Sequence, residues 1–261
     1  MIYEALAELE RNNGAGALCT IVRSVGSTPR HVGSKMLVYP DGHIVGTVGG
    51  GEMESRVIAE ALDAIRDSKP RNLEYSMADP ERGDPGVCGG QLEVFVDPIQ
   101  PKPTLVLVGA GHVGRAVAHL AHWLGFRVVV TDDRPEFCTP EAVPEGDAYY
   151  PLPLAELPGQ YDINPWTYIV MTTRGVDIDV KGLPGLLDSP AAYIGVIGSQ
   201  RRWKTSRDQI LESGVPAEKI DRVHSPIGLE LHAETPEEIA VSIMAEIIML
   251  RRGGDAAPMS E

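Results

Sequence analysis

The stretch LVLVGAGHVGRAVAHLA, residues 105–121, joins a wholly apolar run to a helical pattern through three glycines. Gly109, Gly111 and Gly114 stand in the G-x-G-x-x-G spacing, after a predicted strand and at the start of a predicted helix. The first glycine permits a tight turn, the second lets a pyrophosphate approach the backbone, and the third lets helix and strand pack closely. The pattern predicts a dinucleotide-binding βαβ unit, although such a fold also occurs without a bound nucleotide.

An acidic residue follows at the position that binds ribose in such units. Asp132 comes 23 residues after Gly109, at the end of the predicted strand RVVVTD, where a carboxylate accepts hydrogen bonds from ribose hydroxyls. Asp132 and Asp133 together would repel a 2′-phosphate, which favours NAD over NADP, whereas the nearby Arg134 weakens that preference. The cofactor predicted for this half is NAD or another dinucleotide.

Strands and helices alternate from Thr104 onward, which indicates a Rossmann-like doubly wound parallel sheet. The last helix is predicted from its ends: Thr235 is an N-cap, Pro236 takes the first helical position, Glu238 completes a capping box and Gly253 closes the far end.

A proline-rich segment, DPIQPKPT at residues 97–104, separates two different sequence patterns. Proline-rich stretches of this kind are typical of linkers. Before it, a short helix, several strands, a hairpin around Pro-Asp-Gly and a second helix predict a small α+β domain. The α/β chain is therefore expected to hold a domain over residues 1–98, a linker over 99–103 and a Rossmann-like domain over 104–261.

Composition narrows the function classes. The 261 residues carry a net charge of −14, which argues against non-specific binding to nucleic acid or to an anionic membrane. The three cysteines are odd in number and far apart, so we expect neither a disulfide framework nor a structural zinc site. The amphipathic, acidic N-terminus is unlike a signal peptide, and no apolar run approaches the ~20 residues of a membrane span. We therefore expect a cytoplasmic protein.

The stretch GTVGGGE, residues 46–52, is a second glycine-rich turn. Consecutive glycines at Gly49, Gly50 and Gly51 favour a nest whose N–H groups point inward, and a helix beginning near Glu52 adds its positive end. Such a loop suits a phosphate or another oxyanion. A tight strand-to-helix connection without a ligand explains the same glycines, and helix capping alone explains Glu52.

Two basic residues lie in the preceding loop, GSTPRHVGSKM. Arg30 and Lys35 are candidates for the cationic side of an anion pocket, the alternative being an ordinary solvated loop.

Several motifs together resemble those of the XdhC/CoxI family. The motifs, which cover nearly the whole chain in order, are GSTPRHVGSKMLV, GTVGGGEMESRV, CGGQLEVFVDP, LVLVGAGHVGRAVAHLAHWLGFRVVVTDDRPEF, YIGVIGSQRR and SPIGLELHAETPEEIAVSIMAEI. The resemblance implies a maturation factor for molybdenum hydroxylases of the xanthine dehydrogenase type. It would bind molybdenum cofactor (molybdopterin), assist its sulfuration with a cysteine desulfurase, and deliver it to the apo-enzyme. A chaperone is thus favoured over a turnover enzyme.

Cys88 lies in the glycine-rich stretch RGDPGVCGGQ, within the CGG motif of that family. A thiol that handles sulfur must be reachable and able to ionise, and a soft thiolate suits molybdenum. Cys88 is therefore the candidate catalytic and metal-contacting residue. A small buried residue at the base of a loop is the alternative.

Two other functions stay open: an NAD-dependent oxidoreductase of unknown substrate, and a non-catalytic partner protein that senses a nucleotide. The sequence also leaves the oligomeric state open, a homodimer included.

Overall fold

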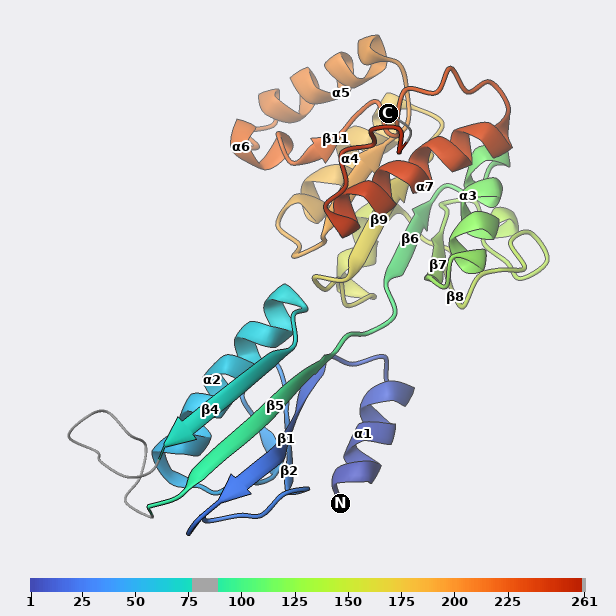
Figure 1. Ribbon diagram of the computed structural model, residues 1–261. Coiled ribbons are helices and arrows are strands. Elements are labelled where there is room, and N and C mark those ends of the chain that lie inside the picture. Colours follow the sequence, from blue (N-terminus) through green and yellow to red (C-terminus); the bar gives the residue numbers. More distant parts are fainter. Residues whose placement is uncertain (77–88, 260–261) are drawn as a thin grey trace. The chain divides into compact units, whose positions relative to one another are not determined.

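The computed structural model describes residues 1–76 and 89–259. The chain divides into two compact units, Met1–Pro101 and Lys102–Glu261 (Figure 1). In the described part of the chain, no helix is long and apolar enough to cross a membrane.

The N-terminal unit is a five-stranded antiparallel sheet with two helices, in the strand order β3-β2-β1-β5-β4. Its elements are α1 (Ile2–Arg11), β1 (Gly16–Val25), β2 (Lys35–Val38), β3 (Ile44–Gly46), α2 (Gly51–Asp67), β4 (Arg71–Ser76) and β5 (Gln91–Ile99).

Helix α2 supplies much of the core of this unit. Its sequence repeats apolar residues at helical spacing, and Met53, Val57 and Ala61 are buried as that period predicts. The helix packs against β1, β4 and β5, where alternate strand residues such as Cys19 and Ile21 are fully buried. This packing fixes the N-terminus of α2 at the glycine-rich loop.

The predicted hairpin around Pro-Asp-Gly is confirmed. Strands β2 and β3 pair antiparallel, with Leu37 opposite Val45. Gly42 takes a φ of +83° in the turn, a left-handed conformation that glycine adopts without a steric cost.

The C-terminal unit is a six-stranded sheet in the order β11-β10-β9-β6-β7-β8, and every pairing between these strands is parallel. Its strands are β6 (Thr104–Val108), β7 (Arg127–Thr131), β8 (Ala148–Tyr150), β9 (Thr167–Met171), β10 (Tyr193–Val196) and β11 (Val223–His224). Its helices are α3 (His112–Trp123), η2 (Pro135–Phe137), η3 (Leu154–Gly159), α4 (Val176–Leu187), α5 (Gln200–Glu212), α6 (Ala217–Ile220) and α7 (Pro236–Arg252).

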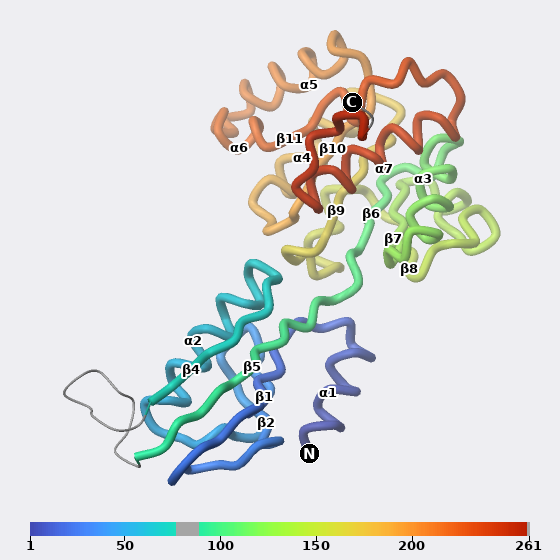
Figure 2. Tube along the Cα trace, in the orientation of Figure 1, coloured from blue at the N-terminus to red at the C-terminus, as the bar shows by residue number. Residues whose placement is uncertain are grey.

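Helices cover both faces of this sheet, so its central strands β6 and β9 are buried along their whole length. Leu105 and Leu107 of β6 belong to the core shared with α3 and α7. Val106 and Val108 of the same strand face the opposite core, with η3, α4 and α5. Figures 1 and 2 show α3 and α7 running side by side. The predicted Rossmann-like fold is confirmed.

The ends of α7 agree with the prediction from sequence. Thr235 is the N-cap and accepts a hydrogen bond from the Glu238 N–H, while the Glu238 side chain accepts one from the Thr235 N–H. Pro236 occupies the first turn, and Gly253 closes the helix with a φ of +70°.

Candidate functional site

A cavity of about 140 Å³ lies at the carboxyl ends of β6, β7 and β9. This is the edge at which open α/β sheets bind ligands. The residues that line this C-terminal cleft come mainly from the ends of β6, β7 and β9 and from the turns that follow these strands. They are Val108, Gly109, Gly111, Thr131, Asp132, Asp133, Arg134, Leu152, Leu154, Thr172, Thr173, Arg174 and Ile178.

The three glycines of the fingerprint meet different constraints. Gly109 has a φ of +94°, and a Cβ there would lie 2.8 Å from the Thr172 carbonyl oxygen. A Cβ at Gly114 would lie only 2.1 Å from the Gly109 carbonyl oxygen, so no larger side chain fits between helix and loop. Gly111 is the N-cap of α3, and among the described atoms none comes within 4 Å of a Cβ placed there. The space beside Gly111 is open to a ligand.

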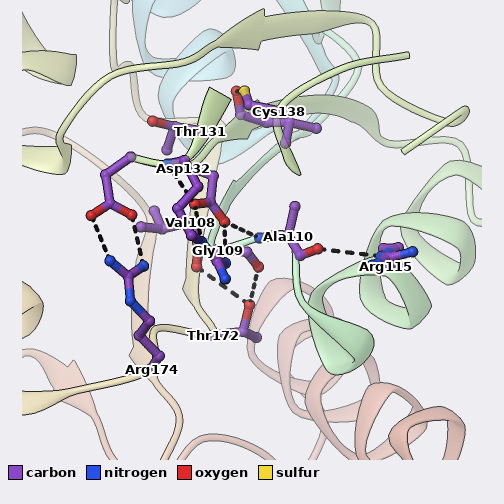
Figure 3. A network of polar contacts seen from close by, with 12 residues as sticks. Val108, Gly109, Ala110, Arg115, Thr131, Asp132, Cys138, Thr172 and Arg174 are labelled. Atoms are coloured by element: carbon purple, nitrogen blue, oxygen red, sulfur yellow. Dashed lines mark hydrogen bonds and ion pairs between the residues drawn. The ribbon is translucent and has the colours of Figure 1, made fainter. Parts of the chain in front are cut away.

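Asp132 is buried at the end of β7, and its side chain is 1% exposed. Its Oδ2 atom accepts a hydrogen bond from the Ala110 N–H at 2.9 Å (Figure 3). The Arg134 side chain donates to both carboxylate oxygens, at 2.9 and 2.8 Å, and the Arg134 N–H donates to Oδ1 at 3.0 Å. Asp132 therefore ties the glycine-rich turn of residues 109–111 to the end of β7. Its predicted contact with ribose stays a prediction.

The neighbouring acid makes a different contact. Asp133 forms a two-pronged ion pair with Arg174, at 2.7 and 2.8 Å, which joins the loop after β7 to the loop after β9 (Figure 3). The hydrogen bond from Arg174 holds the pKa of the Asp133 carboxyl below its ordinary value. Sequence reasoning missed Arg174, because nothing in the chain marks a residue 41 positions away as the partner of Asp133.

A second network of hydrogen bonds, from α4 and α5, holds the loop after β9. Asp179 of α4 is fully buried and accepts hydrogen bonds from the hydroxyl of Thr173 and, at 2.8 Å, from the guanidinium of Arg202. Arg202 also donates to the Thr173 carbonyl oxygen at 2.9 Å. The Arg202 Nε atom is buried without a hydrogen-bond partner in the described part of the chain. Only Arg202 of this network stands in a motif that the sequence singled out.

Three loops of the N-terminal unit meet at one end of its sheet. A Cβ at Gly49 would lie 2.8 Å from the Cγ atom of Pro29, which places the glycine-rich loop before α2 against the loop after β1. A Cβ at Gly90, just before β5, would lie 2.2 Å from the Ser27 carbonyl oxygen. The structure thus brings together, as an N-terminal loop cluster, residues 26–30, 47–51 and 89–90.

The glycine-rich loop of this cluster holds a carboxylate of the chain itself. Glu54 accepts hydrogen bonds at its Oε2 atom from the N–H groups of Val48 and Gly50, both at 3.2 Å, and from the Thr47 hydroxyl. Sequence reasoning considered Glu52 instead. That residue is exposed and pairs with Arg56 at 2.6 Å.

The predicted basic residues lie around the same loop. The Lys35 carbonyl oxygen accepts a hydrogen bond from the Thr47 N–H at 3.1 Å, and the Lys35 Nζ atom donates to the Gly33 carbonyl oxygen at 3.4 Å. Arg30 is exposed, and its carbonyl oxygen accepts the Thr28 hydroxyl at 2.9 Å. Arg30 and Lys35 remain candidates for the cationic side of a pocket.

The thiols separate by environment. Cys19 is fully buried in β1, and burial raises the pKa of its thiol to about 12. Cys138 is also buried, and burial raises the pKa of its thiol. Cys88, the predicted chemical thiol, lies outside the described residues. The described histidine, cysteine and acidic residues include no group of three or more arranged to hold a metal ion.

The family comparison covers both units. The XdhC Rossmann domain matches residues 105–247, and the XdhC and CoxI family matches residues 9–76. The chain belongs to the XdhC and CoxI family. A solved structure described as a xanthine dehydrogenase from Bacillus halodurans shares the fold of this XdhC-family chain, with a TM-score of 0.53, 24% identity and 98% of each chain covered.

Three curated relatives resemble this XdhC-family chain. The uncharacterized protein YqeB of Escherichia coli strain K12 is 40% identical, over 99% of this chain and 48% of its own length. A probable xanthine dehydrogenase subunit from Bacillus subtilis strain 168 is 36% identical, over 61% of this chain and 46% of its own. The molybdenum cofactor insertion chaperone PaoD of E. coli K12 is 22% identical, over 92% of this chain and 85% of its own. The chain spans about half the length of the first two.

Proposed function

We propose that this protein is an accessory protein in the maturation of a molybdenum hydroxylase of the xanthine dehydrogenase type. The observation that carries this proposal is the family match across both units, together with similarity along 92% of the chain to a relative named as a molybdenum cofactor insertion chaperone. In this proposal the chain binds the cofactor, takes part in its sulfuration with a cysteine desulfurase, and hands it to the apo-enzyme.

The N-terminal loop cluster has features that suit the phosphate of molybdenum cofactor. Gly50 and Gly51 have φ values of +79° and +66°, and no described atom comes within 4 Å of a Cβ at either position. The open side of this loop adjoins the first turn of α2, where N–H groups without helical partners favour an anion. Glu54 fixes the loop from its inner side, and Arg30 and Lys35 supply positive charge nearby. When bound, the cofactor supplies the molybdenum centre that the client uses for hydroxylation.

The sulfuration step is assigned to Cys88 on sequence grounds. It directly precedes Gly89 and Gly90, and Gly90 lies against the loop of Ser27 in this cluster.

An NAD-dependent oxidoreductase is the second candidate function. The observation that favours it is the dinucleotide fingerprint, of which Gly109 and Gly111 line the C-terminal cleft. Hydride transfer between NADH and a carbonyl substrate would support this function over the first.

Mass spectrometry of ligands released from the protein tests the proposed function. The full chain should be purified anaerobically from a host that makes molybdenum cofactor, and molybdopterin or its dinucleotide should be found in stoichiometric amounts. The loaded protein should then activate an apo-hydroxylase of the xanthine dehydrogenase type. Protein that carries no pterin and activates no such enzyme would contradict the proposal.

A pair of glycine variants locates the cofactor site. Gly50→Val places a branched side chain in the open space of the loop, and we expect cofactor retention to fall. Gly42→Val is the matched control, since Gly42 also has a positive φ of +83° with no described atom within 4 Å, but lies in the β2–β3 turn. Both substitutions place a branched side chain at a positive φ, so a difference in retention between the two folded variants reports on the site. Equal retention by both variants would place the cofactor elsewhere.

A further inference from the structure

The two acids at the end of β7 differ in what they can offer a ligand. The carboxylate of Asp132 receives four hydrogen bonds, from the Ala110 N–H and from three N–H groups of Arg134. An ionised carboxylate has about four acceptor positions, so its capacity is filled. The Asp133 side chain, in contrast, is 35% exposed and faces Arg174 across the C-terminal cleft.

The Asp133–Arg174 pair is the weaker of the two contacts. Both of its side chains are partly exposed, at 35% and 51%, so water can solvate the two charges when they separate. Separating Asp132 from Arg134 would instead leave a buried charge without its partner, which is far more costly. A ligand that enters the cleft can therefore displace the Asp133–Arg174 pair, while the Asp132 contacts persist.

The Asp133–Arg174 pair also bears on the size of the cleft. Its volume of about 140 Å³ lies below the roughly 300–1,000 Å³ of sites that enclose small molecules. Asp133 and Arg174 come from different loops on its two sides, so their separation would widen the cavity. The open space at Gly111 and the N-terminus of α3 lie on the same cleft.

The geometry points to Asp133 and Arg174 as the residues that select a nucleoside diphosphate in this cleft. The displaced Asp133 carboxylate accepts hydrogen bonds from the two ribose hydroxyls. The freed Arg174 guanidinium binds a phosphate, whose other oxygens meet the N–H groups at the start of α3. The ligand exchanges one ion pair for two charge-assisted contacts, so no charge is left unpaired. This inference goes beyond the proposed function, because it concerns nucleotide recognition and does not require molybdenum.

Calorimetric titration of the full chain with ADP and with CDP tests the inference, because the two share the ribose diphosphate and differ in the base. The 2′,3′-dideoxy forms of both nucleotides lack the hydroxyls that Asp133 would bind. We expect the wild type to bind at least one ribonucleotide about tenfold or more tightly than its dideoxy form. Asp133→Asn should abolish that preference, because an amide accepts such hydrogen bonds less strongly than a carboxylate. It should not weaken binding of the dideoxy form, because Arg174 then has no ion pair to give up before it binds the phosphate.

Two further variants complete the test. Arg174→Gln should weaken binding of the diphosphate but not that of the nucleoside without phosphate, because Asp133 then has no ion pair to give up before it binds the ribose. Asp221→Asn is the matched control, since Asp221 pairs with Arg207 at 3.1 Å in the same unit but does not line the cleft. It should bind nucleotides as the wild type does. The inference is overturned if the wild type binds neither ADP nor CDP at millimolar concentration, or if Asp133→Asn keeps the preference for ribose. Either result leaves the test for bound pterin unaffected.

Discussion

The Glu54 carboxylate accepts the Gly50 N–H at 3.2 Å, so the chain places one of its own anions on the inner side of the glycine-rich loop. The same Oε2 atom receives the Val48 N–H and the Thr47 hydroxyl. Glu54 stands one turn into α2, and its contacts run back to Thr47, Val48 and Gly50, three of the four residues that precede the helix. The loop is therefore held in shape before any ligand binds.

Glu54→Ala should lower the stability of the N-terminal unit by at least about 2 kcal/mol, because it removes three hydrogen bonds to a charged group and a single one contributes about 1.5–3 kcal/mol. Hydrogen exchange, followed by mass spectrometry on peptides from residues 44–67, should show faster exchange at the start of α2. Glu52→Ala is the control: Glu52 is 63% exposed in a surface ion pair, so its loss should change stability by less than about 1 kcal/mol. Equal effects of the two variants would contradict the role given to Glu54.

Substitution by alanine should destabilise the protein by different amounts at two glycines of the fingerprint. Gly114→Ala introduces a Cβ 2.1 Å from the Gly109 carbonyl oxygen, and we expect a loss of stability of about 1–3 kcal/mol. Gly111→Ala enters open space at an ordinary φ of −73°, so its cost should stay below about 1 kcal/mol.

Urea unfolding followed by tryptophan fluorescence measures both effects, because Trp123, Trp166 and Trp203 all belong to the C-terminal unit. A Gly114→Ala protein as stable as the wild type would show that helix and loop can separate. Weaker nucleotide binding by a stable Gly111→Ala protein would then report on the ligand alone.

Glu246 should make the stability of the C-terminal unit depend on pH. Burial by itself would raise the pKa of its carboxyl, but the contact with His224 at 3.6 Å and hydrogen bonds from the Tyr193 hydroxyl and the Gly228 N–H outweigh burial and lower it below 4.5. A carboxyl whose pKa is lower in the folded state stabilises the fold at pH values above its unfolded pKa. That contribution is lost as the pH falls through the folded-state pKa.

Thermal unfolding of Glu246→Gln and of the wild type should be compared between pH 7 and pH 3. The variant should be less stable at pH 7, and the difference should shrink below pH 4.5 as the wild-type carboxyl takes up a proton. Glu230→Gln, at a side chain that is 82% exposed, serves as the control and should follow the wild type. A difference between Glu246→Gln and wild type that is constant with pH would contradict this expectation.

Alkylation should separate the three thiols. Cys19 and Cys138 are buried with raised pKa values, so both should react slowly with iodoacetamide at pH 8 in the native protein. Cys88 should react first, and bound cofactor should protect it. Peptide mapping after timed quenching gives the rates, with the urea-unfolded protein as the reference in which all three react. Fast modification of Cys138 together with an inert Cys88 would reverse the assignment of the chemical thiol.

Local signals predicted much of the fold. The caps of α7 and the turn at Gly42 follow from short-range chemistry, and both agree with the structure. Helix α4 was missed, because Gly182, Pro184 and Gly185 lower its intrinsic helical propensity. Its leucines at 183, 186 and 187 are buried against the sheet, so tertiary packing outweighs that propensity.

The site residues also divide into those that the local sequence predicts and those that depend on tertiary packing. A glycine motif can be recognised in a sequence because a tight turn or a close approach requires glycine at fixed positions. Gly109 and Gly114 meet those constraints in the structure. Partners of charged residues depend on long-range packing instead. Glu54 resembled any acid in a first helical turn, and the contact between Asp133 and Arg174 exists only because β7 and β9 end at the same edge of the sheet.

The edge strands of the C-terminal sheet are short, and this bears on how the protein behaves at high concentration. Strands β8 and β11, which end the sheet, have three and two residues. A foreign strand needs a longer row of free N–H and carbonyl groups to dock, so this sheet offers little template for growth into fibrils. Strand β4 ends the N-terminal sheet with six residues, and Arg71 and Glu74 place charges along it. Charged edges of this kind oppose strand addition, so we expect concentrated protein to resist β-rich aggregation.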